Sequence, residues 1–231
     1  MKVAILSDIH ANRFALEAVL SDLDRAGVET ILFAGDVVGY YYWPRQTIDR
    51  IVADGRFICI RGNHEDIFRE YVADASCRDS YRKKYGSGYD VCLSELDAGH
   101  LAWLDQLPEQ ASVEIGGRRF FMRHGSLRST DEYIYPDADA AKLLANHSGE
   151  DITIFGHTHY PFVHASGERL LLNPGSVGQP RDVGGLASYA LVLTDTGVVQ
   201  FRRRNFDKDA VAAAAKARDP ELAYLWKILE R

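Results

Sequence analysis

Short apolar runs along this chain are followed directly by polar residues that can do chemistry. The runs lie at residues 3–6, 31–34, 57–60, 120–122 and 152–155. Continuous apolar runs of this length, bounded by turn-forming residues, are typical of strands that are buried on both faces. The polar residues therefore begin where the predicted strands end.

A helix is predicted after each of the first three strands. An apolar stripe with the spacing i, i+3, i+4 and i+7, beginning at Leu16, predicts a helix over residues 12–26, which Gly27 ends. Further helices are predicted over residues 46–53 and from residue 64 onward. Strands and helices that alternate in this way form βαβ units with a parallel sheet.

The second half of the chain predicts hairpins instead. Gly116 and Gly117 form a turn signal between two segments of strand character. A second turn, at residues 195–197, separates strands predicted at 189–193 and 198–202. Parallel units followed by hairpins predict an α/β (α+β) fold in which two mixed sheets pack face to face under a cover of helices.

Two more helical regions complete the pattern. Residues 82–107 form a helical insert, which we interpret as a lid or a flank of the sandwich. A C-terminal helix is predicted within residues 207–230, where Asp219 and Pro220 supply a cap and a first-turn proline. Because no Pro-, Gly- or Ser-rich linker interrupts the 231 residues, we expect a single domain.

Composition narrows the class of partner. The net charge is −6, so no overall basic field exists to hold long nucleic acid, and we interpret the basic residues 202–204 as a solvated edge strand. No apolar stretch reaches the roughly 18 residues of a membrane span, and the first run is too short for a signal peptide. We therefore expect a cytoplasmic protein. The 3 cysteines are widely spaced, which predicts reduced thiols.

The residues that follow the apolar runs include carboxylates, an amide and imidazoles. Such donors suit borderline divalent ions such as manganese, iron, cobalt, nickel or zinc. In open α/β sheets ligands collect outside the carboxyl ends of the strands, so we expect these loops to converge on one site. The segments are Ser7 to His10, Gly35 and Asp36, Arg61 to His64, Arg123 to Gly125, and Gly156 to His159.

Two of these segments carry candidate ligands two residues apart. In extended backbone, such side chains point to the same side about 7 Å apart, so one metal cluster can receive both. Isolated histidines, by contrast, are usually surface or satisfied core residues. We interpret the histidines outside every motif as surface or satisfied core residues; these are His100, His147 and His164.

In order and local spacing, the segments follow the pattern D-x-H, G-D, G-N-H-(D/E), H and G-H-x-H. This pattern resembles the calcineurin-like metallophosphoesterase superfamily, and residues 173–181 resemble a segment of its small bacterial phosphodiesterase-type branch. The resemblance covers roughly residues 1–200. It implies a four-layer αββα sandwich with a dinuclear metal centre.

The resemblance also implies roles for residues. Two divalent ions would activate water for direct attack on a phosphoester. His64 would face the substrate as the catalytic residue, either to protonate the leaving oxygen or to steady the phosphate, against the alternative of a plain polar residue at a helix start. One ion would be held by Asp8, His10, Asp36 and His159, and the other by Asp36, Asn63, His124 and His157.

Candidate substrate contacts lie outside the metal ligands. The chain lacks the aspartate and arginine of the protein-phosphatase motif G-D-x-V-D-R-G, and Arg181 can replace that arginine as a phosphate clamp or pair with Asp182. Tyr40 begins an aromatic cluster, residues 40–43, that can stack on a base, pack in the core or contact another subunit. Asn12 can cap a helix or contact substrate. Glu65, in place of a common aspartate, receives little weight.

The sequence therefore predicts a dinuclear metal-dependent phosphodiesterase acting on a small or nucleotide-like phosphoester. The alternatives within enzymes are a phosphomonoesterase, a protein phosphatase and a dinucleoside polyphosphate hydrolase. A nuclease is disfavoured by the acidic charge. A non-catalytic binding scaffold of the same fold is disfavoured because every ligand position is filled. The native metal and the oligomeric state, including a homo-oligomer, stay open at this point.

Overall fold

The computed structural model describes residues 1–231 and contains two five-stranded sheets. The first has the strand order β10-β9-β1-β2-β3 and the second β4-β5-β6-β8-β7. The first sheet comprises β1 (Lys2–Leu6), β2 (Thr30–Phe33), β3 (Phe57–Cys59), β9 (Leu186–Leu193) and β10 (Val198–Asn205). The second comprises β4 (Gln110–Ile115), β5 (Arg118–Arg123), β6 (Ile152–Ile154), β7 (Pro161–Ser166) and β8 (Arg169–Pro174).

Both sheets are mixed, as the sequence predicts. In the first, β1 pairs with β2 and β2 with β3 in parallel, whereas β9 and β10 join as antiparallel strands. In the second, β5, β6 and β8 are parallel, and β4 and β7 pair antiparallel at the edges. The β4–β5 turn uses Gly116 and Gly117, both with positive φ. Strands β7 and β8 and helix α7 (Ala140–Ala145) were not predicted.

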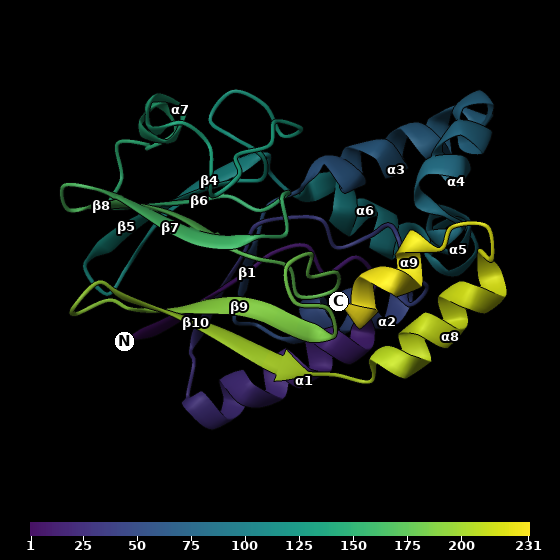
Figure 1. Ribbon diagram of the computed structural model, residues 1–231, viewed down its shortest axis with the longest axis horizontal. Coiled ribbons are helices and arrows are strands. Elements are labelled where there is room, and N and C mark those ends of the chain that lie inside the picture. The colour runs from purple at the N-terminus through teal and green to yellow at the C-terminus, as the bar shows by residue number, and fades with distance from the viewer.

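The layers follow from the alternation of side chains along each strand. Along β1, Ala4 and Leu6 join the apolar cluster under the helices, whereas Val3 and Ile5 join the cluster between the sheets. Figure 1 shows the result: α1 (Arg13–Ala26) lies on the outer side of the first sheet, and α7 lies on the outer side of the second. The chain is thus a four-layer sandwich of two mixed sheets flanked by helices.

The first helices match their prediction closely. Helix α1 is capped by Asn12, whose side chain accepts a hydrogen bond from the Ala15 N–H, and it ends at Gly27 in the left-handed conformation. Helix α2 spans Pro44–Ala53 and α3 spans Asn63–Ala73. None of the helices combines the length and apolar character required to cross a bilayer.

The insert is built from several short helices. It comprises a 3₁₀ turn (Ala75–Cys77), α4 (Arg78–Tyr85), α5 (Gly88–Glu95) and α6 (Ala98–Gln106), and so begins before residue 82. Tyr85, Tyr89 and Leu104 are buried in the same apolar cluster as β1 and α1. The insert is therefore a flank of the sandwich and not a detached lid.

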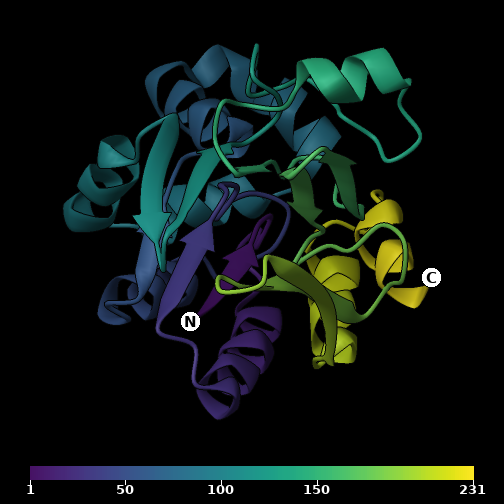
Figure 2. The same ribbon diagram turned by 90° about the vertical axis from the view of Figure 1, so that its left-hand side faces the viewer.

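The single C-terminal helix predicted within residues 207–230 is wrong. The chain forms α8 (Lys208–Arg218), a turn, α9 (Tyr224–Lys227) and a 3₁₀ turn (Ile228–Glu230), shown in yellow across the molecule from the β4–β5 hairpin in Figure 2. Asp219 does not cap a following helix. Its carboxylate accepts hydrogen bonds from Tyr42 Oη (2.7 Å) and from the Ser87 N–H (3.0 Å) and hydroxyl (2.9 Å), which ties this end of the chain to the insert.

Two minor expectations also have outcomes. The basic residues of 202–204 lie on edge strand β10, where Arg203 pairs with Asp182 and Arg204 pairs with Asp22 at 2.6 Å. These ion pairs thus neutralise much of the local positive charge. All three cysteines are free, as predicted.

Candidate metal centre

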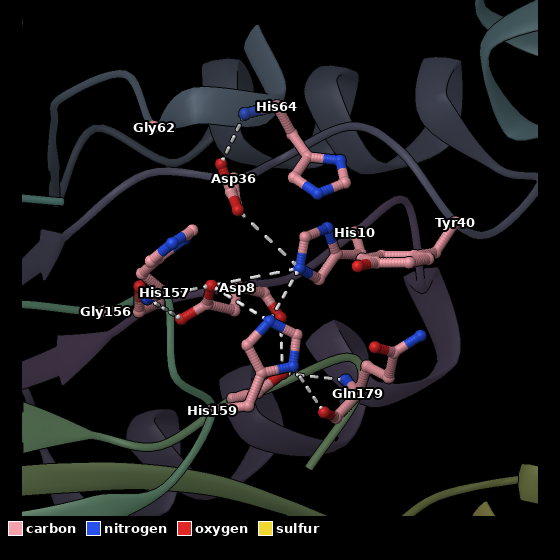
Figure 3. A network of polar contacts seen from close by, with 12 residues as sticks. Asp8, His10, Asp36, Tyr40, Gly62, His64, Gly156, His157, His159 and Gln179 are labelled. Carbon is pink, nitrogen blue, oxygen red and sulfur yellow. Dashed lines mark hydrogen bonds and ion pairs between the residues drawn. The ribbon is translucent and has the colours of Figure 1, made fainter. Parts of the chain in front are cut away.

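The loops after β1, β2, β3, β5 and β6 converge on one buried cluster. Every member of the cluster is at most 7% exposed, although its members come from positions up to about 150 residues apart in the chain. Figure 3 shows most of these side chains pointing toward one another. The cluster comprises Asp8, His10, Asp36, Asn63, His64, His124, His157 and His159.

The backbone that presents these side chains is not extended, which corrects the sequence argument. Asp8, His10, Asp36, His157 and His159 all have positive φ, between 50° and 67°. A non-glycine residue in this region carries strain of about 1–3 kcal/mol and persists only where surrounding structure enforces it. Here the loops hold one another: the Asp8 N–H donates to Gly35 O and the His10 N–H to Asp36 O, each at 3.0 Å.

Three histidines have their ring orientation set by a backbone carbonyl. The Nδ1 atom lies 3.0 Å from Val38 O in His10, 2.7 Å from Ala34 O in His124 and 2.6 Å from Gln179 O in His159. Because a carbonyl only accepts, each Nδ1 carries a proton, and in the neutral ring Nε2 then presents a lone pair inward. This is the tautomer that a metal ligand requires.

The inward donors form two adjoining groups. In the first, Asp8 Oδ1 lies 3.3 Å from His159 Nε2 and 3.8 Å from His10 Nε2. In the second, Asp36 joins His124 and His157, with Asp36 Oδ2 at 3.0 Å from His124 Nε2. Asp36 Oδ2 also lies 3.8 Å from His10 Nε2, so this carboxylate is placed between the groups.

The charge balance of the cluster suits cations. Burial raises the pKa of Asp8, but the attraction of His159, His124 and His10 outweighs it and holds that pKa well below its usual range. Burial and the neighbouring Asp8 raise the pKa of Asp36. Two buried carboxylates that repel each other in this way are stabilised by positive charge between them.

Buried polar atoms without partners provide a direct test of fit. Asn63 Oδ1, His124 Nε2 and His157 Nε2 are inaccessible and form no hydrogen bond. An unsatisfied buried acceptor costs about 1–3 kcal/mol, so three in one cluster indicate a ligand that these atoms bind. All three belong to the donor set expected for the second ion, and the residues therefore fit a divalent metal.

Glu65 has a structural role that the sequence argument missed. Its side chain is buried and accepts four backbone N–H bonds, from Asp36 and Gly62 to Oε2 and from Val37 and Val38 to Oε1, at 2.7–3.1 Å. The carboxylate thus shapes the loop that carries Asp36. Only the Gly62 bond, a helix-capping contact three residues before Glu65, has a local signal in the sequence, because the other three donors lie on another loop.

A pocket of about 220 Å³ opens above the cluster. Its wall includes the cations Lys84 and Arg181 and four tyrosines, three of which the sequence did not single out: Tyr85, Tyr133 and Tyr224 join Tyr40. None of these three lies in a motif. Their rings come from the insert, from the loop after β5 and from α9, so only the folded chain assembles this wall.

Arg181 is free for a ligand. Its guanidinium donates to Tyr40 Oη at 3.3 Å and forms no ion pair. The alternative partner, Asp182, instead accepts from Arg203 at 3.1 Å. Arg181 also lines the pocket, so an unpaired cation faces the space next to the candidate metal ligands.

Of the other predicted substrate contacts, some line the pocket and others lie in the protein core. Tyr40 lines the pocket and packs edge-on against His10 with ring centroids 4.6 Å apart. Tyr41 and Tyr42 are core residues whose hydroxyls donate to Leu225 O and Asp219. Asn12 is fully buried and does not line the pocket. Its side-chain amide caps α1 and donates to Gly178 O at 2.8 Å, so both of its polar atoms have partners within the fold.

Comparison with known proteins agrees with this geometry. The model of the calcineurin-like phosphoesterase superfamily domain matches residues 1–197. An uncharacterized protein of Methanocaldococcus jannaschii is 31% identical over 95% of this chain and 94% of its own length. Phosphodiesterase YfcE of Escherichia coli is 27% identical over 84% of this chain and 89% of its own. A metallophosphoesterase from Sphaerobacter thermophilus superposes with a TM-score of 0.80 at 29% identity over 99% of both chains.

A buried set of carboxylate, amide and imidazole donors lies below a pocket with a free arginine, an arrangement that suits a metal-dependent reaction on a phosphoester. The match to the family model extends over most of the sequence. The chain therefore belongs to the calcineurin-like phosphoesterase superfamily, and it is a metal-dependent hydrolase of phosphoester bonds.

Proposed function

We propose that the site binds two divalent ions and hydrolyses a small phosphodiester. The observation that carries the proposal is the pair of donor groups with Asp36 between them, Asp8/His10/His159 and Asp36/His124/His157, together with the unpartnered Asn63 Oδ1. When bound, two such ions supply Lewis acidity to a phosphate oxygen and lower the pKa of water. No thiol or hydroxyl nucleophile is needed from the protein.

The chain's own residues would bind and orient the substrate around that centre. Arg181 would hold a non-bridging phosphate oxygen, because a free guanidinium binds phosphate through charge-assisted hydrogen bonds. Lys84, at the rim, adds a second positive charge. His64, at the pocket floor, would contact the phosphate or the leaving oxygen.

The pocket wall favours an aromatic organic group on the substrate. Tyr40, Tyr85, Tyr133 and Tyr224 line it, and rings of this kind stack on nucleobases and other planar groups. The small volume, about 220 Å³, favours a small phosphoester over a folded protein substrate. A nucleotide-like phosphodiester fits both observations, and YfcE, one relative, carries the name phosphodiesterase.

Elemental analysis combined with a substrate panel tests the proposal. The protein, loaded in turn with manganese, iron, cobalt, nickel or zinc, is assayed on bis-para-nitrophenyl phosphate, the corresponding monoester, cyclic nucleotides and dinucleoside polyphosphates. We expect two metal equivalents and faster turnover of diesters than of monoesters. One metal equivalent, or activity that survives complete metal removal, would refute the dinuclear mechanism; a preference for monoesters would replace diester by monoester hydrolysis.

The role of His64 is tested by substitution. His64→Ala should lower kcat by about 100-fold, within the usual range for loss of a residue that acts on the transferring group, while leaving both metals bound. His64 also lies within ligand reach of His10 and Asp36, so metal content is the deciding measurement. Loss of metal in this variant would make His64 a ligand instead.

A further inference from the structure

The His64 side chain has one polar partner, and it comes from the insert. Tyr89 Oη, on α5, lies 2.6 Å from His64 Nδ1, and both residues are buried. The backbone N–H of His64 donates to Asp36 Oδ1 at 2.9 Å, which holds the start of α3 against the metal ligands. Figure 3 shows the ring directed toward His10 and Tyr40, on the pocket side.

The direction of the Tyr89–His64 hydrogen bond follows from donor accounting. Burial raises the pKa of the Tyr89 hydroxyl well above its usual value, so the hydroxyl keeps its proton. Its contact with His64 is the one hydrogen bond that the hydroxyl makes. If Nδ1 donated, the phenol proton would be left buried without an acceptor, at a cost that donation to Nδ1 avoids. Tyr89 therefore donates, and the His64 ring carries its proton on Nε2.

This tautomer is the opposite of that in the metal ligands. The carbonyl partners of His10, His124 and His159 force the proton onto Nδ1 and free Nε2 as a lone pair. In His64 the hydroxyl partner donates to Nδ1, so the proton lies on Nε2 and His64 presents an N–H to the pocket. An N–H does not ligate a cation but does donate to a phosphate oxygen.

The surroundings allow little freedom to this pair. Tyr89 stacks on Phe68 with an interplanar angle of 9° and also contacts Tyr71, with ring centroids 5.4 Å apart. Gly39 also approaches this nitrogen closely, because a Cβ atom placed on Gly39 would lie 2.2 Å from Nδ1. The ring is thus confined between α5 and the loop after β2.

We infer that Tyr89 is a positioning residue that holds His64 as the neutral Nε2–H tautomer, so that His64 donates a hydrogen bond to a non-bridging phosphate oxygen and neither binds metal nor protonates the leaving group. The inference rests on the proposed function. It selects between the two roles open to His64, because a neutral imidazole that gave up its single ring proton would have to become an anion.

Kinetics on a leaving-group series test the role. Tyr89→Phe should lower kcat about tenfold with unchanged metal content, and the factor should be the same for para-nitrophenyl and for less acidic phenyl diesters. Tyr71→Phe is the matched control, because Tyr71 is also buried next to Tyr89 but its hydroxyl donates to Asp90 at 2.8 Å. The kcat of Tyr71→Phe should equal that of the wild type. A loss that grows as the leaving group becomes less acidic would overturn the inference in favour of proton transfer.

Nuclear magnetic resonance of the zinc-loaded protein gives a readout independent of turnover. The imidazole ¹⁵N shifts of His64 should show a protonated Nε2 in the wild type, with Nδ1 becoming protonated in part in Tyr89→Phe. A wild-type His64 protonated on Nδ1 would refute the inference. If the wild type instead hydrolysed no phosphoester with any metal, the proposed function would fail while the tautomer result would still stand or fall by itself.

Discussion

An imidazole has two nitrogens, and in this site the partner of one decides what the other can do. His10, His124 and His159 each give Nδ1–H to a carbonyl and so offer a lone pair at Nε2. His64 Nδ1 instead accepts a hydrogen bond from the Tyr89 hydroxyl. Residue type alone does not distinguish these histidines; the group behind each ring does.

Gly62 shows why a motif position tolerates one residue type. A Cβ atom at this position would lie 2.1 Å from Asp36 Oδ1, the oxygen that accepts from the His64 N–H. Any side chain would therefore push the Asp36 carboxylate away from its place between the two donor groups. The glycine is required by close approach rather than by a turn.

Arg181 carries a prediction at this scale. Arg181→Ala should raise KM about 10- to 100-fold and change kcat less, because removal of a hydrogen bond to a charged group costs about 1.5–3 kcal/mol of binding. Steady-state kinetics on the best diester measure this. Arg25→Ala, at the far end of α1 from the site, is the control and should leave KM unchanged. An unchanged KM in Arg181→Ala would remove this residue from the site.

At the scale of elements, the strands do more than form sheets. Each donor loop starts where a strand of the sandwich stops, so the parallel order β1, β2 and β3 brings Asp8, Asp36 and Asn63 to one edge. Glu65 then joins two of these loops through four N–H bonds. The strained backbone at the ligands is held by such contacts between loops.

The end of helix α2 carries a prediction about pH. Asp54, which ends this helix, accepts two hydrogen bonds from Arg56, at 2.8 Å and 2.7 Å, and these bonds lower the pKa of Asp54 to about 2. A pKa lowered by folding stabilises the protein above the unfolded pKa, and this contribution is lost as the pH falls toward 2. Asp54→Asn should therefore lower the free energy of unfolding by about 1 kcal/mol at pH 7.

The difference between wild type and Asp54→Asn should shrink between about pH 4 and pH 2, because the wild-type carboxylate is protonated in that range. Urea denaturation at pH 7, 5, 4 and 3 measures it. Asp195→Asn, in the exposed β9–β10 turn, is the control and should show no such dependence. A gap that stayed constant down to pH 3 would contradict the assigned ion pair.

At the scale of the whole molecule, the pocket is closed by segments far from the metal motifs. Tyr85 comes from the insert, Tyr133 from the loop before α7 and Tyr224 from α9. The Tyr224 hydroxyl donates to Lys84 O at 2.6 Å, so the last helices support the insert. The pocket wall therefore depends on how these segments dock, whereas the candidate metal ligands depend on the sheets.

Asp219 tests that docking. Asp219→Ala should leave the Tyr42 hydroxyl and the Ser87 N–H without their acceptor and lower the free energy of unfolding by about 2 kcal/mol. Hydrogen exchange should rise in α4, α5 and α9 and stay unchanged in β1 and β2, since the core of the sandwich does not use this contact. Asp209→Ala, on the first turn of α8, is the control. Unchanged exchange in the insert would show that other contacts hold it.

Much of the fold was readable from the sequence because it depends on short-range pattern. The apolar runs gave strands within a residue or two of β1, β2, β3 and β6, and the stripe from Leu16 with Asn12 and Gly27 gave α1 with both of its caps. Strands β7 and β8 were missed although the sequence carries a signal for them, since the apolar run Leu170 to Leu172 is as long as that at residues 120–122 and follows a turn at Gly167. Asp219 and Pro220 marked a helix boundary, but the turn that follows them before α9 was not predicted, because Asp219 bonds to distant residues.

The sequence by itself determined the two-sheet architecture, and its motifs pointed to the residues that the fold gathers in one buried cluster, because burial pattern and motif spacing are local properties of the chain. Tertiary structure alone decided the left-handed backbone of Asp8 and His10, the clamp by Glu65 and the pairing of His64 with Tyr89. Each of these is a contact between segments remote in sequence. Such contacts depend on packing geometry, which no spacing of residues along the chain specifies.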